Sequence, residues 1–223
     1  MDKEGIKKNV EMVLQQLEGH DTQLLAATKT RTPEEINWAI ECGVRHIGEN
    51  RVQELLEKYE AINKAQVQIH LIGRLQTNKV KYIIDKVDLI HSVDSARLAA
   101  EISKRALAFG KTQDILLEVN IGGEASKGGV AEQDIPPLLD EISSLSGIRV
   151  RGLMCIPPPA VKKHQNREYF FKMHQLLVDI KAKKLDNIHM DILSMGMSND
   201  YEDAIDAGSS FIRIGRGIFG ARN

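Results

Sequence analysis

The feature that most limits the fold of this chain is a regular alternation between short apolar runs and amphipathic helical patterns. Apolar or β-branched residues gather in eight runs, at positions 24–28, 44–47, 67–73, 89–93, 114–121, 150–156, 190–195 and 211–215. Each run has the length of a buried strand, and each but the last is clearly followed by a helical pattern. Eight strand–helix units with short connections predict an α/β fold, the (β/α)8 TIM barrel. A doubly wound open sheet is the alternative, because alternation alone does not establish that the sheet closes.

The N-terminal segment predicts one extra helix. Its apolar residues recur at steps of three and four and therefore share one helix face: Ile6, Val10, Val13, Leu14 and Leu17. Little chain follows the eighth run, so we expect this helix to pack on the barrel in the gap left by the last unit. Since no linker interrupts the alternation, residues 1–223 are predicted to form a single domain.

Charge and cysteine content argue against several classes of function. The 30 Lys and Arg residues balance 31 Asp and Glu residues, so the net charge of −1 provides no broad basic surface for nucleic acid or an anionic membrane. The N-terminus lacks the apolar core of a signal peptide, and no run approaches the ~20 apolar residues of a membrane helix. Cys42 and Cys155 have neither a disulfide-framework nor a metal-ligand spacing. We therefore expect a soluble cytoplasmic protein without a metal site.

Lys29 is the first candidate functional residue, because it directly follows an apolar run and precedes a helix start at Thr32 and Pro33. In a barrel, the carboxyl ends of the strands form the ligand-binding face. Desolvation of a lysine there lowers its pKa, which makes the free amine available to condense with an aldehyde. The alternative is that Lys29 merely closes the strand and extends its ammonium group into water.

Two other strand ends have the composition of a phosphate site. They are residues 194–198 (SMGMS) and 213–217 (RIGRG). Both place small residues before a helical turn, where free backbone N–H groups and the helix dipole bind phosphate, and barrels typically build this site from loops seven and eight. Taken singly, each glycine is explained by the turn alone. Together with a lysine on the first strand, the two turns indicate a phosphorylated aldehyde as the ligand.

Several motifs then appear in an order that resembles a known family. They are residues 26–30 (AATKT), 48–51 (GENR), 70–79 (HLIGRLQTNK), 151–154 (RGLM), 193–198 (LSMGMS), 213–215 (RIG) and 218–220 (IFG). Across nearly its whole length the chain resembles the pyridoxal phosphate homeostasis proteins, which are single-domain relatives of the barrel in alanine racemases.

The resemblance implies that the cofactor is pyridoxal 5'-phosphate (PLP) and that Lys29 holds it as a Schiff base. It also implies that Ser198 and the turn at Gly215 and Arg216 hold the phosphate, and that Arg213 faces the pyridine nitrogen. Because arginine retains its proton, the ring nitrogen would stay largely unprotonated, and carbanion chemistry would be disfavoured.

Asn50, Met197 and Arg216 carry expectations of their own. Asn50 is expected near the cofactor ring or its phenolic oxygen, whereas Met197 either contacts the cofactor or fills the core. Arg216 departs from the family pattern, which usually has Thr or Ser there. A charge or the backbone alone would then replace a hydroxyl contact to the phosphate.

The remaining polar candidates are mostly explained by structure. His46, His70 and His91 lie in or next to strands without metal-ligand spacing, and we predict that they are hydrogen-bonded barrel histidines. Lys127 lies in the glycine-rich segment 122–129. It is either solvated or able to fold over the barrel mouth as a second amine.

Two functions remain open. The first is PLP homeostasis, in which a non-catalytic protein, a monomer or weak dimer, buffers the cofactor and delivers it to apo-forms of PLP-dependent enzymes. The second is a PLP-dependent amino-acid racemase or aldolase. Racemisation needs a base on each face of the substrate Cα, and only Lys29 can be assigned. The tyrosines of this chain are not assigned as the second base, because all of them are placed in helices: Tyr59, Tyr82, Tyr169 and Tyr201. A partner chain could supply that base instead.

Overall fold

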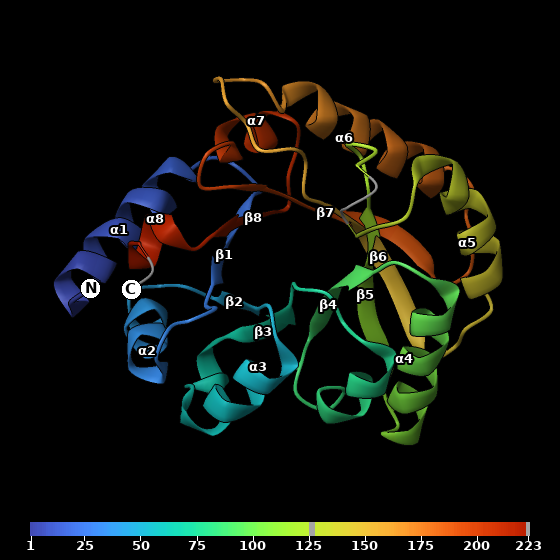
Figure 1. Cartoon of the computed structure of the whole chain (residues 1–223), viewed down its shortest axis with the longest axis horizontal. Coiled ribbons are helices and arrows are strands. Elements are labelled where there is room, and N and C mark those ends of the chain that lie inside the picture. The colour runs from blue at the N-terminus through green and yellow to red at the C-terminus, as the bar shows by residue number, and fades with distance from the viewer. Residues whose placement is uncertain (125–127, 222–223) are drawn as a thin grey trace.

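Eight parallel strands form a closed barrel in the computed structural model, which describes residues 1–124 and 128–221 (Figure 1). The strands are β1 (Gln23–Ala27), β2 (His46–Glu49), β3 (Gln68–Leu71), β4 (Leu89–Val93), β5 (Gln113–Val119), β6 (Ile148–Cys155), β7 (Ile188–Met197) and β8 (Phe211–Ile214). Each strand pairs with the next along the chain, and β8 pairs with β1. This closure confirms the predicted (β/α)8 barrel and excludes the open sheet.

The helices form an outer layer around the strands (Figure 1). They are α1 (Lys3–Gln16), α2 (Pro33–Glu41), α3 (Val52–Lys58), α4 (Ala96–Ala108), α5 (Ile135–Ile142), α6 (Arg167–Lys181), α7 (Tyr201–Asp206) and α8 (Arg216–Phe219). Thr32 caps α2 through a reciprocal capping box with Glu35, and Pro33 occupies the first helical position. The N-terminal helix α1 packs against α2 and the four-residue α8, which confirms its predicted place in the ring.

The units after β2 and β3 contain less α-helix than the sequence predicted. The helical pattern that follows the second apolar run predicts a helix over about residues 51–65, but α3 ends at Lys58 and is followed by the 3₁₀ helices η1 (Tyr59–Ala61) and η2 (Lys64–Gln66). The pattern after the third run predicts a helix over about residues 78–85, where the structure has the 3₁₀ helix η3 (Thr77–Tyr82). Its β-branched residues crowd an α-helical backbone, and so short a segment gains little from helical cooperativity.

The barrel separates two apolar clusters. The larger one fills the space between the strands and the helices. The smaller one lies inside the barrel and consists of Leu25, Ala27, Ile72, Leu89, Leu116, Met154 and Phe211. Polar side chains share this interior, including His70, His91 and Ser194, which are all buried. The barrel is therefore a packed core with a polar column, and the site described below lies at one end of it.

Within the described residues, every helix is too short or too polar to cross a bilayer.

Candidate functional site

A cavity of about 670 Å³ opens at the carboxyl ends of the strands. It falls in the range of roughly 300–1,000 Å³ that is usual for small-molecule sites. Its lining comes from the carboxyl ends of β1, β7 and β8 and from the segments that follow β1, β2, β3, β6, β7 and β8. All seven residues predicted to hold the cofactor line it: Lys29, Asn50, Met197, Ser198, Arg213, Gly215 and Arg216. The structure thus brings them together, although their roles remain predictions.

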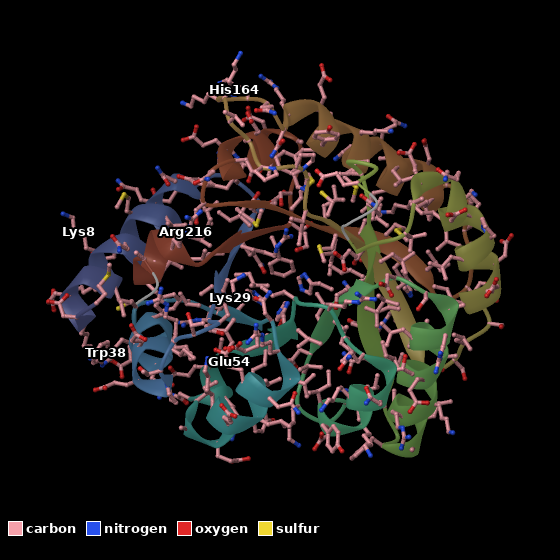
Figure 2. The ribbon with its side chains drawn as sticks, in the orientation of Figure 1. Lys8, Lys29, Trp38, Glu54, His164 and Arg216 are labelled. Atoms are coloured by element: carbon pink, nitrogen blue, oxygen red, sulfur yellow. The ribbon has the colours of Figure 1, made fainter. Side chains whose placement is uncertain are left out.

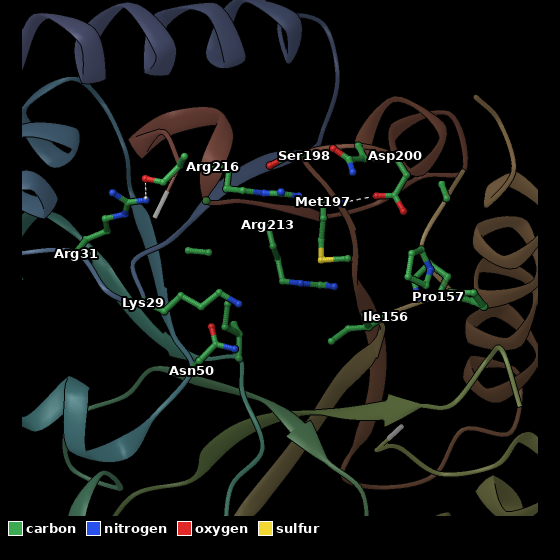
Figure 3. Close-up of a pocket in the computed structure, with 18 residues that line it drawn as sticks. Lys29, Arg31, Asn50, Ile156, Pro157, Met197, Ser198, Asp200, Arg213 and Arg216 are labelled. Carbon is green, nitrogen blue, oxygen red and sulfur yellow. Dashed lines mark hydrogen bonds between the residues drawn. The ribbon is translucent and has the colours of Figure 1, made fainter. Parts of the chain in front are cut away.

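Lys29 lies two residues beyond the last residue of β1, whereas the sequence suggested the strand end itself. Its side chain is partly buried and runs into the cavity, where the amine and the guanidinium of Arg213 approach the same space (Figure 3). Figure 2 shows the contrast with Lys8, which projects outward from α1. This placement favours a ligand-facing lysine over one that simply closes the strand.

A buried ion pair holds the chain just before Lys29. Lys58 Nζ donates to Glu49 Oε1 at 2.9 Å and to the carbonyl of Thr28 at 3.0 Å, and the Thr28 hydroxyl donates to the same carboxylate oxygen at 2.8 Å. Glu49 is fully buried, and this burial raises its pKa, while Lys58 opposes the rise. The contacts tie the end of β1 to β2 and α3.

The chain just after Lys29 is held by a second carboxylate. The backbone N–H of Thr30 donates to Glu54 Oε1, which also accepts from Lys58 Nζ at 2.6 Å. Thr30 has a φ of +64°, in the left-handed region that non-glycine residues rarely adopt. Residues on both sides of Lys29 are therefore fixed by one network centred on Lys58.

Arg213 brings a buried positive charge to the cavity wall. Only 5% of it is exposed, and it donates to Ser194 Oγ and to the carbonyl of Cys155, both at 2.8 Å. Both acceptors are neutral. Burial lowers the pKa of Arg213, but a guanidinium stays charged in proteins. Two of its five N–H donors are used by these contacts, so donors remain for a ligand acceptor.

Asn50 contributes a buried acceptor without a partner. Its Oδ1 is shielded from solvent and makes no hydrogen bond to any described residue. Such an atom is costly unless a ligand or water satisfies it. Its backbone is packed closely against Gly73, where a Cβ would lie 2.2 Å from the Asn50 carbonyl oxygen. Only glycine at position 73 leaves room for Asn50 in this place.

The end of β7 changes direction at Gly196, which has a φ of +89°. Its pairing with β8 shifts register between Ser194 and Met197. The backbone N–H of Met197 then donates to Asp200 Oδ1 at 2.7 Å, which closes the turn. The turn directs Ser198 toward the start of α8, since a Cβ on Gly217 would lie 3.7 Å from Ser198 Oγ. The ends of the neighbouring strands β7 and β8 thus form one polar rim, visible in Figure 3.

Sequence reasoning missed several residues that line the cavity. Arg31 donates to the carbonyl of Gly220 at 2.8 Å and lies over the ring of Phe219, so it attaches the C-terminal segment to the rim. Its position two residues after Lys29 was the available signal. Asp200 is the second missed residue, and in the sequence it is recognisable only as a turn-forming residue after Ser198. The third is the proline-rich segment at residues 157–159 after β6, whose sequence indicates only that the strand cannot continue. Lys127 lies outside the described residues.

The predicted role of the three histidines is confirmed. Ring nitrogens of His46 and His70 are 3.2 Å apart, those of His70 and His91 are 2.8 Å apart, and His91 lies 2.9 Å from Ser194 Oγ. Among residues 1–124 and 128–221, no cluster of His, Cys, Asp and Glu could hold a metal ion.

Comparison with known proteins places this chain in a family. Residues 1–223 match the family model described as alanine racemase, N-terminal domain. The pyridoxal phosphate homeostasis protein of Aquifex aeolicus is 46% identical over 200 residues, which cover 90% of this chain and 87% of that protein. The chain belongs to the pyridoxal phosphate homeostasis protein family. The member from Escherichia coli K12 is 36% identical over 203 residues, covering 90% and 86% of the two chains.

Solved structures agree with this assignment. PipY of Synechococcus elongatus, a structure with PLP bound, superposes with a TM-score of 0.88 at 30% identity, covering 96% of this chain and all of that one. An alanine racemase from Corynebacterium glutamicum gives a TM-score of 0.76 at 14% identity, with 99% of this chain and 62% of the racemase covered. The likeness to the alanine racemase shows a shared barrel fold alone.

Proposed function

We propose that this protein binds PLP through Lys29 and acts in PLP homeostasis rather than in amino-acid turnover. The observation that carries the proposal is a single cavity containing an inward-facing lysine and a buried guanidinium with neutral partners. The names of the curated relatives and the PLP-bound PipY structure support the choice of cofactor.

The residues present fit PLP. Lys29 offers an amine to the aldehyde, and Arg213 offers donors to a ring nitrogen. Asn50 offers its Oδ1, a buried acceptor without a partner among the described residues, to the ring hydroxyl of PLP. Ser198, Gly215 and Arg216 line the rim on which a phosphate would lie. When bound, PLP supplies a reactive aldehyde and an electron-withdrawing ring.

Arg213 makes this site a poor one for carbanion chemistry. It retains its proton and can only donate a hydrogen bond, so it does not pass a proton to the ring nitrogen. The electron-withdrawing capacity of the ring is then reduced. A site that holds PLP without activating it suits a protein that stores the cofactor.

The racemase or aldolase alternative lacks a second base at the cavity. Asp200 is the one carboxylate among the described residues that line it, and both of its oxygens are used, by Met197 N–H and by the Asn166 amide at 2.7 Å. The four tyrosines lie in outer helices and 3₁₀ turns. We therefore propose that the protein does not turn over amino acids. Rapid and stereochemically complete exchange of the α-proton of an amino acid would contradict this.

The first experiment tests cofactor binding. The wild-type protein mixed with PLP is expected to show a visible absorption band that Lys29→Ala abolishes. Lys8→Ala, an exposed lysine on α1, is the matched control and keeps the band. Retention of the band in Lys29→Ala would contradict the proposal.

The second experiment tests homeostasis itself. An apo-form of a PLP-dependent enzyme is titrated with PLP alone and with the PLP-loaded protein, and recovery of enzyme activity is followed. We expect the loaded protein to restore activity, and Lys29→Ala mixed with the same total PLP to behave like free PLP. We also propose that the protein is cytoplasmic and that it is a monomer or a weak dimer. Loaded protein that never releases PLP to the apo-enzyme would contradict delivery.

A further inference from the structure

The polar column inside the barrel forms one continuous chain of hydrogen bonds that starts at the wall of the cavity. It begins at Arg213 and passes through Ser194 on β7, His91 on β4 and His70 on β3 to His46 on β2. Successive links measure 2.8, 2.9, 2.8 and 3.2 Å. Four of the eight strands contribute a side chain beyond Arg213 itself, so the chain crosses the barrel interior.

The direction of these hydrogen bonds is determined by Arg213. A guanidinium can only donate, so Ser194 Oγ accepts from it. Ser194 is fully buried, and among its hydrogen-bond partners in the described residues only Nδ1 of His91 can accept its hydroxyl hydrogen. Because an unmade hydrogen bond from a buried hydroxyl is costly, Ser194 donates to His91 Nδ1.

The same logic assigns the proton on each histidine. With Nδ1 of His91 accepting, its proton lies on Nε2, which then donates to Nδ1 of His70 at 2.8 Å. His70 in turn carries its proton on Nε2 and donates to Nδ1 of His46 at 3.2 Å. All three rings are therefore neutral Nε2–H tautomers. His91 and His70 each donate away from Arg213.

Burial and ring packing support neutral histidines. His91 is fully buried and His70 is 1% exposed, and Phe211 packs against all three rings. Burial lowers the pKa of His70 to about 3, and burial together with His70 and the charge of Arg213 lowers the pKa of His91 well below its usual value. An additional proton on His91 would place a second donor against Ser194 Oγ. The hydrogen-bond chain therefore favours one protonation pattern, in which all three histidines are neutral.

We propose that this directional histidine chain is a positioning device for Arg213, in which Ser194 and His91 are positioning residues. Ser194 can accept from Arg213 with full strength only while its own hydroxyl hydrogen is bound by His91. The chain thereby fixes the position of the guanidinium. It does not neutralise the positive charge of Arg213, since every other group in the chain is neutral. The last step, from a fixed Arg213 to the cofactor, rests on the proposed function.

The first measurement needs no cofactor. Nuclear magnetic resonance of the ¹⁵N-histidine-labelled apo-protein distinguishes the two neutral tautomers and the imidazolium. At pH 7 we expect Nε2–H tautomers for His46, His70 and His91, with each assigned by its own substitution to Gln. An Nδ1–H tautomer or a charged ring at His91 would overturn the proposal, whatever the protein does with PLP.

The second measurement follows the effect on PLP. Ser194→Ala removes the acceptor of Arg213 and the donor to His91, and Ser194→Thr retains the hydroxyl. Met154→Leu, a volume-conserving change elsewhere in the barrel interior, is the matched control. We expect Ser194→Ala to shift the His91 signal from the Nε2–H form, to weaken PLP binding about tenfold and to move the absorption maximum, whereas the other two variants resemble the wild type.

The two measurements separate the failure of each proposal. A wild-type protein that lacks the PLP band contradicts the proposed function, while the tautomers in the apo-protein still test the histidine chain. Ser194→Ala with wild-type tautomers, wild-type PLP affinity and a wild-type absorption maximum would overturn the positioning role.

Discussion

At the scale of residues, the cavity depends on buried charges that hold one another in place. Lys58 is the clearest case, because its ammonium group contacts Glu49, Glu54 and the carbonyl of Thr28 around the turn that carries Lys29. Glu49 Oε2 is buried without a partner among the described residues, so this carboxylate depends strongly on Lys58. Removing one member of a buried ion pair leaves the other uncompensated, which is far more costly than losing a surface pair.

We therefore predict that Lys58→Met destabilises the protein by about 3–5 kcal/mol in urea unfolding, because Glu49 is left buried and charged. Adding Glu49→Gln to Lys58→Met removes that charge and is expected to recover part of the loss. Lys64→Met is the control, since Lys64 pairs with the exposed Glu60 and a surface pair contributes about 0–1 kcal/mol. Equal destabilisation by Lys58→Met and Lys64→Met would show that the buried pair has no special role.

At the scale of elements, short irregular segments after the strands give the site its shape. Gly196 bends the end of β7 with a φ of +89°, and a Cβ there would lie 2.5 Å from the Cβ of Ala204 on α7. Met197 and Ser198 reach the cavity because of this bend. Both the backbone conformation and the packing therefore require glycine.

Gly196→Ala is expected to cost about 1–3 kcal/mol from backbone strain, with a further cost from the clash with Ala204. It should also weaken PLP binding, because Ser198 is displaced. Gly110→Ala is the matched control: its φ is +66°, but nothing lies within 4 Å of the added Cβ, so only the conformational cost of about 1 kcal/mol applies. Urea unfolding and PLP titration of both variants check this. If Gly110→Ala proves the more damaging of the two, the account of Gly196 is wrong.

The elements were largely predictable from sequence, and their contacts were not. Apolar runs and helix caps such as Thr32 are local signals, and they located all eight strands. The 3₁₀ helix η3 was missed because the pattern of Val80, Ile83 and Ile84 does not distinguish one tight turn from a short α-helix. Lys58 was missed because its partner Glu49 belongs to another element, and nothing in the sequence pairs them. The histidine chain was missed for the same reason, although its members were recognised as barrel histidines.

At the scale of the whole molecule, the buried histidines link stability to pH. The folded-state pKa of His70 is lowered to about 3, whereas an unfolded histidine titrates near its usual value of about 6.5. Below pH 6.5 the unfolded chain therefore binds more protons than the folded chain. The free energy of unfolding consequently decreases as the pH decreases. Lowered pKa values at His46 and His91 act in the same direction.

We predict that stability is fully present above about pH 6.5 and falls as the pH decreases toward 3. His70 alone is expected to cost roughly 1 kcal/mol between pH 7 and 5.5, and His91 adds to that loss. Urea unfolding at pH 7, 6.3 and 5.5 measures this, in a range above the titration of ordinary carboxylates. A free energy of unfolding that stays constant over this range would contradict the neutral histidine chain.

The central claim is that the amine of Lys29 is the group in this barrel that captures PLP. Borohydride reduction of the PLP-treated protein, followed by proteolysis and mass spectrometry, tests it most directly. We predict a single phosphopyridoxyl adduct on the peptide that contains Lys29, lost in Lys29→Ala and kept in Lys8→Ala. An adduct found mainly on another lysine in the wild-type protein would contradict the account.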